Sequence, residues 1–272
     1  MSTVVLLGAG LGARLRPLTD DRPKAVVEVA GEPLAVRILR QFAERGVRSA
    51  TVIVGHFAAR AQELIGPRVR GTGGAFIDVR FVENAEYSTT NTMYSLLLGM
   101  DALTTGGGFV VEGDIIADEA VLDRLLAASP ERSHWAVDAW TPAHTGSRLT
   151  DDGEGHIVQQ EIWRGATTGP TPRMWKSAGM LRLSSAGARH LAAALAHEAE
   201  LGNRGIYYDD VIGKYLRGDA ASPAPALREP FSIDVLDLQG APWMEIDDLN
   251  DMAQARSMFE RASDRPSEGA AS

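Results

Sequence analysis

Cysteine is absent from the 272 residues of this chain. Disulfide frameworks, thiolate nucleophiles, zinc ribbons and iron–sulfur sites all depend on that side chain, so the sequence excludes them together. Basic charge is also in deficit, because 27 Lys and Arg stand against 36 Asp and Glu and leave a formal net charge of −9. Proteins that hold nucleic acid use surplus basic charge for its phosphates. We therefore expect no nucleic-acid partner. A small anionic ligand whose charge is neutralised by a metal ion is compatible with the composition.

Long apolar runs are absent as well. The first run, 3–7, ends at Gly8, far short of the roughly 20 residues of a membrane-spanning helix. No basic segment precedes it, which argues against a signal peptide. The sequence thus predicts a soluble cytoplasmic protein with no membrane partner. It leaves the oligomeric state open, a homo-oligomer included.

Short apolar runs alternate with helix-type periodicity through the first half of the chain. We expect strands over 3–7, 50–54, 76–81 and 109–111, and helices from Pro33 onward and over 58–65, 92–100 and 119–127. This alternation is typical of βαβ units, which build a mostly parallel sheet flanked by helices. The predicted fold class is therefore α/β.

The second half is less regular. We expect strands over 134–140, 156–162, 177–183 and 231–236, helices over 186–200, 207–216 and 249–261, a surface loop over 220–225 and a disordered tail over 264–272. The length favours one large domain over 1–263. Its first half, 1–130, would bind a nucleotide and its second half, 131–263, an acceptor.

A glycine-rich loop follows the first strand. Gly8-Ala9-Gly10-Leu11-Gly12-Ala13 formally satisfies the dinucleotide fingerprint. That fingerprint must open a helix, however, and Pro17 and Pro23 interrupt any helix here, which disfavours a nicotinamide-dependent oxidoreductase. No G-x-x-x-x-G-K-[ST] sequence occurs, so a P-loop is excluded.

The same loop is basic. It carries Arg14, Arg16, Arg22 and Lys24 beside the glycines. Guanidinium groups and closely approaching backbone N–H groups suit a triphosphate. The alternative interpretation is a solvated surface loop.

Two motifs resemble those of a known family. Gly10-x-Gly12-x-Arg14-Leu15-x-Pro17-Leu18-Thr19, followed by Pro23-Lys24, resembles the signature loop of nucleotidyltransferases that join a nucleoside triphosphate to a phosphorylated small molecule. Asn91-Thr92-Met93-Tyr94-Ser95-Leu96 resembles a segment of the phosphocholine cytidylyltransferases and their phosphonate-using relatives. The chain departs from the family pattern at Ala13, Thr92 and Glu112. The resemblance implies a Rossmann-like nucleotidyltransferase fold with a mixed, mostly parallel central sheet.

The resemblance also implies roles for individual residues. Arg14 would hold the leaving pyrophosphate, and Lys24 the α-phosphate or the incoming phosphate. Glu112-Gly113-Asp114 and Glu245-Ile246-Asp247 fall where the family has metal ligands, so Mg²⁺ would bind Asp114 and Asp247. The nucleotide contacts expected are Leu7, Ala9, Gly10, Gly12, Gly55, Asn84, Asn91 and Ser95.

The residues themselves support this metal site in part. Asp114 follows a buried strand, and open α/β sheets place ligands at the carboxyl ends of strands. Its alternative role is that of a turn residue after Gly113. Asp247 lies in an acidic stretch where Asp248 is a candidate cap of the last helix, so without the family pattern it would carry no prediction.

Tryptophan is unevenly distributed, because all five tryptophans lie after residue 134. Aromatic faces beside carboxylates can hold an amine or quaternary ammonium, although core packing is the alternative role for each one. The acceptor candidates are Glu112, Tyr94, Trp163, Trp175, Tyr207 and Asp210. The segment 165–172 is a candidate lid over them.

The leading prediction is a Mg²⁺-dependent cytidylyltransferase. It would couple CTP, or another nucleoside triphosphate, to a phosphocholine-like or 2-aminoethylphosphonate-like acceptor and release pyrophosphate. The alternatives are a sugar-1-phosphate nucleotidylyltransferase and a non-catalytic nucleotide-binding regulator.

Overall fold

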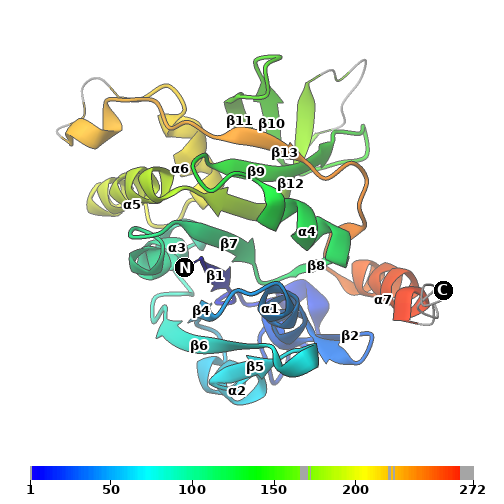
Figure 1. Cartoon of the computed structure of the whole chain (residues 1–272). Helices are drawn as coiled ribbons and strands as arrows, with labels where there is room; N and C mark the ends of the chain where they lie inside the picture. The colour runs from blue at the N-terminus through cyan, green and yellow to red at the C-terminus, as the bar shows by residue number, and fades with distance from the viewer. Residues whose placement is uncertain (1, 166–170, 172, 220–221, 223, 264–272) are drawn as a thin grey trace.

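The computed structural model describes residues 2–165, 171, 173–219, 222 and 224–263. Its centre is a ten-stranded sheet in which the order β11-β10-β12-β7-β1-β4-β6-β5 forms the main path, while β9 pairs with β12 and β13 with β9 (Figure 1). The strands are β1 (Thr3–Leu7), β4 (Ser49–Val54), β5 (Arg68–Arg70), β6 (Phe76–Glu83), β7 (Gly108–Glu112), β9 (His134–Ala139), β10 (Gly146–Asp151), β11 (Ile157–Trp163), β12 (Met174–Leu183) and β13 (Asp234–Asp237).

The sheet is mixed. The first-half strands β1, β4, β6 and β7 run parallel to one another. Strand β12 then pairs antiparallel with β7, so the sheet continues from the first half of the chain into the second. Two small sheets accompany it and are formed by β2 (Glu28–Val29) with β3 (Glu32–Pro33), and by β8 (Ile115–Ala117) with β14 (Trp243–Glu245).

Helices cover both faces of the sheet. Because successive side chains of a strand point to opposite faces, Val4 and Leu6 of β1 join one core cluster while Val5 and Leu7 join another. The first cluster includes α1 (Leu34–Glu44), α2 (Ala58–Ile65) and α4 (Glu119–Ala127), and the second includes α3 (Thr92–Gly99), α5 (Ser185–Glu200) and α6 (Tyr208–Tyr215). Strands β1, β4 and β7 are largely buried and have nearly continuous apolar runs, whereas β6 alternates apolar and charged residues.

The last described helix packs in a core cluster of its own, to which α1 contributes only Leu34. Side chains of α7 (Leu249–Ser263) bury against the glycine-rich loop and β8 through a third cluster that contains Leu15, Ile116 and Ile246. Figure 1 shows α7 beside the end of β8. This packing returns the end of the described chain to the loop that follows β1.

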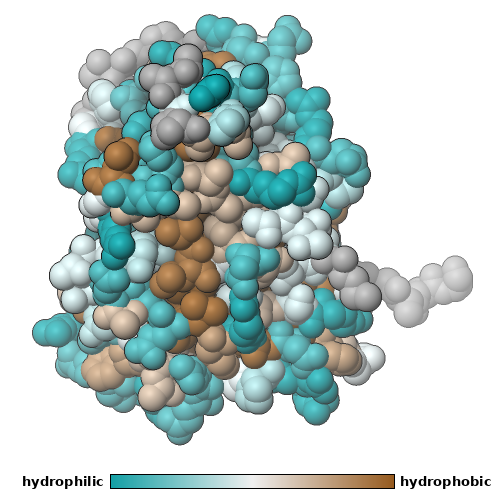
Figure 2. Space-filling view, turned by 90° about the vertical axis from the view of Figure 1, so that its left-hand side faces the viewer, coloured by the Kyte–Doolittle hydropathy of each residue, from teal (hydrophilic) through white to brown (hydrophobic). Residues whose placement is uncertain are grey.

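The outer surface is mainly hydrophilic on the side where α3 and α5 lie. Figure 2 shows one vertical strip of hydrophobic residues there, between hydrophilic flanks. No helix in the described part of the chain combines the length and hydrophobicity that crossing a membrane requires.

The structure confirms the α/β class and the predicted helices and strands, with two differences. The helix expected from Pro33 onward begins at Leu34, because Glu32–Pro33 forms β3, and one strand is shifted. The strand expected over 231–236 lies at Asp234–Asp237 instead. Phe231 and Ile233 are buried, but their backbones bond outside a strand, since Phe231 N donates to Tyr215 O and Ile157 N donates to Ile233 O. Strands β2, β3, β5, β8, β10 and β14 were not predicted: five of them have only two or three residues, and β10 has a polar sequence. The tail 264–272 and residues 220, 221 and 223 of the predicted surface loop lie outside the described residues.

Candidate functional site

The glycine-rich loop and the segment after β7 meet at one edge of the sheet. Strands β1 and β7 are parallel neighbours with Leu7 opposite Glu112, so their carboxyl ends coincide. Gly113 N donates to Leu7 O at 2.9 Å, and a Cβ on Gly113 would lie 2.4 Å from that oxygen. Only glycine allows this approach. Asp114 is thereby placed against the loop that carries Lys24.

Lys24 joins two carboxylates from distant parts of the chain. Its Nζ lies 2.7 Å from Asp114 Oδ2 and 2.6 Å from Asp247 Oδ1. Arg14 Nη2 lies 3.0 Å from the same Asp247 oxygen. Asp247 reaches the cluster because β14 pairs with β8 and Ile246 N donates to Asp114 O. The two predicted cations and the two predicted metal ligands therefore form one group.

The other basic side chains of the loop point elsewhere. Arg16 pairs with Asp20 and Arg22 with Asp21, each within the loop itself. The surface-loop interpretation thus holds for these two residues but not for Lys24, whose side chain is only 14% exposed.

The charges of the cluster shift its ionisation. Burial by itself lowers the pKa of the Lys24 ammonium, but Asp114 and Asp247 outweigh burial and the net pKa lies above its usual value. Burial likewise raises the pKa of Asp247, and Lys24 and Arg14 reverse this, so the net pKa lies below its usual range. Lys24 and Asp247 are therefore both charged at neutral pH.

The donor set fits Mg²⁺ at this cluster. Asp114 Oδ1 is buried and accepts no hydrogen bond from the described residues. Asp114 and Asp247 supply hard oxygen ligands, and Mg²⁺ in nucleotide sites uses one or two carboxylates together with substrate phosphates. No set of three or more His, Cys, Asp or Glu side chains in the described part of the chain is arranged to hold a metal ion. The metal predicted from the sequence would thus need phosphate oxygens to complete its coordination.

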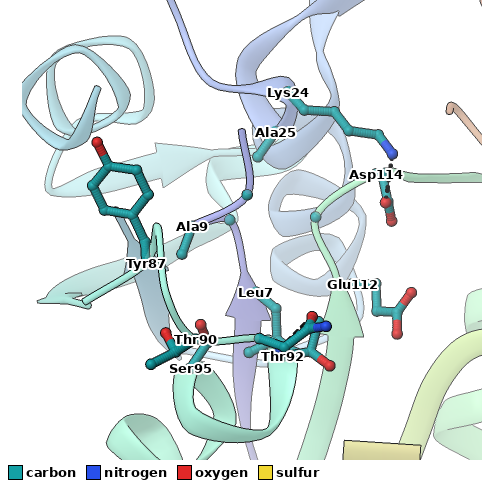
Figure 3. A pocket seen from close by; sticks show the side chains of 14 residues that line it. Leu7, Ala9, Lys24, Ala25, Tyr87, Thr90, Thr92, Ser95, Glu112 and Asp114 are labelled. Carbon is teal, nitrogen blue, oxygen red and sulfur yellow. Dashed lines mark hydrogen bonds and ion pairs between the residues drawn. The ribbon is translucent and has the colours of Figure 1, made fainter. Parts of the chain in front are cut away.

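A cavity of about 140 Å³ opens beside the cluster. Figure 3 shows Lys24 facing Asp114 on one side of it, Tyr87 on the other, and Thr90, Thr92 and Ser95 below. Its lining comprises Leu7, Gly8, Ala9, Gly10, Lys24, Ala25, Tyr87, Thr90, Asn91, Thr92, Ser95, Glu112, Gly113 and Asp114. Asn91 also caps α3, since its Oδ1 accepts a bond from Thr92 N at 2.8 Å.

Three predicted nucleotide contacts support this cavity without lining it. A Cβ on Gly55 would lie 3.0 Å from Ala9 Cβ, so glycine is needed for close packing there. Asn84 is buried, and its Nδ2 donates to Thr90 Oγ1 and to Ser95 Oγ at 3.0 Å each. Gly12 packs against the side chain of Lys24. Tyr87, Thr90 and Thr92 were not predicted from the sequence. They follow β6, whose carboxyl end lies at the same edge of the sheet as those of β1 and β4.

Gly12 allows a stability test of this loop. Its φ is +60°, and an added Cβ would lie 2.9 Å from Lys24 Cβ and 3.1 Å from Thr19 Cγ2. We expect Gly12→Ala to cost about 1 to 3 kcal/mol of unfolding free energy because the backbone strain adds to the clash. Thermal melts check this against Gly10→Ala, whose Cβ meets nothing within 4 Å. Equal melting temperatures for the two variants would contradict it.

A second cavity, of about 450 Å³, adjoins the first and shares Thr92, Glu112 and Asp114 with it. It is also lined by Arg14, Thr145, Gly146, Ser147, Ile162, Trp163, Arg164, Lys176, Ser177, Tyr207, Asp209, Glu245 and Asp247. The predicted acceptor residues Glu112, Trp163 and Tyr207 are therefore brought together. The cluster of Lys24, Asp114 and Asp247 lies where the two cavities meet.

The other acceptor candidates have different partners. Trp175 Nε1 donates to Asp151 Oδ2 at 2.6 Å, and Tyr94 OH donates to Glu86 Oε1 at 3.1 Å. Asp210 Oδ2 accepts from Tyr207 N and so caps α6. None of the three lines either cavity. Of the candidate lid 165–172, residues 166–170 and 172 lie outside the described residues.

Asp209, rather than Asp210, faces the second cavity, together with Lys176 and Glu245, which the sequence analysis did not single out as acceptor residues. Helix α6 begins at Tyr208, which makes Asp210 the capping residue and turns Asp209 inward. The sequence alone did not show where α6 starts, and this start decides which aspartate faces the cavity.

The second cavity carries excess negative charge. Burial raises the pKa of Glu112 well above its usual value, and the nearby charges of Asp114, Asp209 and Glu245 add to the effect. Burial raises the pKa of Asp209 to about 6, although Ser147 and Lys176 act in the opposite direction. Lys176 is paired with Glu245 at 2.8 Å. A ligand that brings positive charge would relieve this repulsion.

The chain is similar in sequence to known proteins over most of its length. A family model described as MobA-like NTP transferase domain matches residues 4–207. The CMP-5'-(3-aminopropyl)phosphonate synthase of Streptomyces rubellomurinus is 31% identical over 94% of this chain, but the match spans only 38% of that relative's length. The 2-aminoethylphosphonate cytidylyltransferase of Lancefieldella rimae is 27% identical over 79% of this chain and 80% of its own length.

A solved structure is similar over nearly the whole chain. The CTP:phosphocholine cytidylyltransferase of Streptococcus pneumoniae superposes with a TM-score of 0.72 at 20% identity, covering 95% of this chain and 100% of that one. Likeness at this identity concerns the fold. It confirms the predicted Rossmann-like nucleotidyltransferase architecture.

Proposed function

The chain belongs to the family of MobA-like NTP transferase domains, and on that premise we propose that it is a cytidylyltransferase. It would transfer a cytidylyl group from CTP to a small acceptor that carries a phosphate or phosphonate at one end and an amine at the other. The observation that carries this proposal is the cluster of Arg14, Lys24, Asp114 and Asp247 at the junction of two cavities.

The two cavities suit the two substrates. The first is formed by the glycine-rich loop and the N-terminus of α3, and backbone N–H groups of the loop would approach the nucleotide phosphates. The second is acidic and adjoins Lys176, a buried cation that would hold the acceptor's phosphonate or phosphate. The relatives named for CMP-phosphonate and 2-aminoethylphosphonate chemistry support the choice of nucleotide and acceptor class.

The reaction needs charge neutralisation above all. An acceptor oxygen attacks the α-phosphorus, a new P–O bond forms, and the bond to the leaving pyrophosphate breaks; the electron pair of the broken bond goes to pyrophosphate. Both reactants are anions, so cations must hold them together. Lys24, a compact point charge between the cavities, would follow the charge on the α-phosphate, and the planar fork of Arg14 would hold the pyrophosphate.

Asp114 and Asp247 would hold Mg²⁺ with the nucleotide phosphates. When bound, Mg²⁺ neutralises charge on the phosphate oxygens. No side-chain nucleophile is required, because the acceptor oxygen is itself nucleophilic. This agrees with the lack of cysteine.

Pyrophosphate release tests the proposal. Each of the four nucleoside triphosphates is assayed with Mg²⁺ against 2-aminoethylphosphonate, phosphocholine and glucose 1-phosphate. We expect release with CTP and an amine-bearing acceptor, and its loss on addition of EDTA. Release only with glucose 1-phosphate would instead establish a sugar nucleotidylyltransferase, and nucleotide binding without release in any pair would favour a regulator.

A further inference from the structure

The backbone at Asp247 is held from two sides. Asp247 lies in the short link 246–248 between β14 and α7, which forms neither helix nor strand. On one side, Ile246 N donates to Asp114 O at 2.9 Å. On the other side, Asp247 N donates to Asp251 Oδ2 at 2.8 Å. The carboxylate of Asp247 therefore projects from a backbone that is fixed before and after it.

Asp251 makes more bonds than the start of its helix requires. It is the third residue of α7, and Asp248 directly precedes the helix. Asp248 Oδ1 accepts from Asn250 N at 2.7 Å and from Asp251 N at 3.0 Å, while Asp251 Oδ2 accepts from Asp248 N at 3.1 Å. This reciprocal pair is a capping box, which satisfies the free N–H groups of a helix start. The further bond from Asp247 N goes beyond capping and reaches a candidate metal ligand.

Helix α7 is also anchored to the loop that carries Arg14. Side chains of the helix are buried in one cluster with Leu15 and Ile246. Since Leu15 follows Arg14 and Ile246 precedes Asp247, the same helix holds the backbone beside both members of this ion pair, whose Nη2 and Oδ1 atoms lie 3.0 Å apart. A rigid support of this kind is what a metal ligand needs, because ligands must be held within a narrow range of geometry.

Asp251 lines neither cavity, so it is placed to act through Asp247 and not on a substrate. We propose that Asp251 is a positioning residue. By accepting the N–H of Asp247, it sets the direction of that carboxylate toward Lys24, Arg14 and the metal ion. The inference rests on the proposed function, in which Asp247 holds Mg²⁺. Groups that orient a metal ligand through a hydrogen bond typically change metal affinity by about 10- to 100-fold when they are removed.

Calorimetric titration of CTP without an acceptor tests the inference in the absence of turnover. The quantity compared is the ratio of the CTP Kd in EDTA to the CTP Kd in Mg²⁺, because this ratio isolates the contribution of the metal ion. We expect Asp251→Ala to lower the ratio about tenfold. Asp251→Asn keeps an oxygen that can accept the Asp247 N–H, so it should restore most of the ratio. An unchanged ratio in Asp251→Ala, or equal losses in both variants, would overturn the inference.

Turnover gives a second readout. In Asp251→Ala, the Mg²⁺ concentration for half-maximal pyrophosphate release should rise about tenfold while KM for the acceptor changes little. Asp118→Ala is the matched control, because it also removes a carboxylate that caps a helix, α4, outside both cavities. It should lower the melting temperature without altering the Mg²⁺ dependence. The same weakening of Mg²⁺ activation in Asp118→Ala would contradict a specific role of Asp251.

A second variant covers the case in which Asp251→Ala does not fold. Asp251→Gln keeps the capping-box bond to Asp248 N, which Gln makes at this position of a helix, but its longer side chain moves the oxygen away from Asp247 N. A full Kd ratio in Asp251→Gln would overturn the inference. A CTP Kd that does not depend on Mg²⁺ in the unchanged protein would overturn metal binding by Asp247, and this inference with it. Absence of pyrophosphate release from the unchanged protein with every acceptor would instead overturn the proposed function.

Discussion

Replacing Lys24 by alanine lowers kcat/KM for pyrophosphate release by about 10³-fold, equivalent to about 4 kcal/mol of transition-state stabilisation. The ammonium stands where the two cavities meet and is held there by Asp114 and Asp247. In the transition state, negative charge is concentrated between nucleotide and acceptor, and a fixed cation at that point favours it more than it favours the bound substrates. Steady-state kinetics under the conditions that give release in the unchanged enzyme provide the measurement.

The Lys24→Ala variant also has a readout that does not depend on turnover. Without the ammonium, Asp114 and Asp247 repel each other across the cluster, so we expect a lower melting temperature than in the unchanged protein. Added Mg²⁺ should then stabilise the variant more than the unchanged protein, because it supplies the missing positive charge.

Arg22→Ala is the matched control for Lys24→Ala. Arg22 lies in the same loop, but its guanidinium pairs with Asp21, so turnover should stay near normal. Near-normal turnover of Lys24→Ala as well would overturn the assignment of Lys24.

Asp114→Asn is expected to lower kcat by about 10³-fold and to shift Mg²⁺ activation to higher concentrations. The amide keeps the size of the side chain but removes the charge that attracts both Lys24 and a metal ion. The free-energy changes of Asp114→Asn and Lys24→Ala should not be additive in the double variant, because the two residues act as one unit. A Mg²⁺ titration of kcat in the single and double variants measures both effects.

Asp118→Asn serves as the control for Asp114→Asn. The Asp118 side chain accepts from Ala120 N and caps α4, outside both cavities. It should retain activity and an unchanged Mg²⁺ requirement. An unaltered Mg²⁺ requirement in Asp114→Asn would contradict the assignment of Asp114 as a metal ligand.

Much of this site was predictable because its signals are local. The alternation of apolar runs and helical periods predicts the βαβ core, and Pro17 with Pro23 excludes an α-helix after the glycines. Asp114 follows a buried strand directly, so its place at the sheet edge required only the strand prediction. Arg14 and Lys24 lie on the loop that leaves the neighbouring strand.

Other parts of the site depended on helix phase and on side-chain partners. Because α6 starts at Tyr208 and not one residue earlier, Asp209 faces the cavity and Asp210 caps the helix. Trp175 and Tyr94 were reasonable acceptor candidates by type, but each has a partner of its own. Asn84 supports two hydroxyl groups instead of lining the cavity.

The sequence by itself determined the α/β class, the basic loop after the first strand and the carboxylate after the fourth parallel strand, because each depends on residues that are neighbours along the chain. Only the tertiary structure decided that Asp247 meets Lys24, since this contact requires β14 to pair with β8 and the last helix to pack on Leu15. It also decided that Asp209 faces the second cavity while Asp210 caps α6. Such contacts join residues far apart in sequence, and local periodicity carries no information about which of them the folded chain brings together.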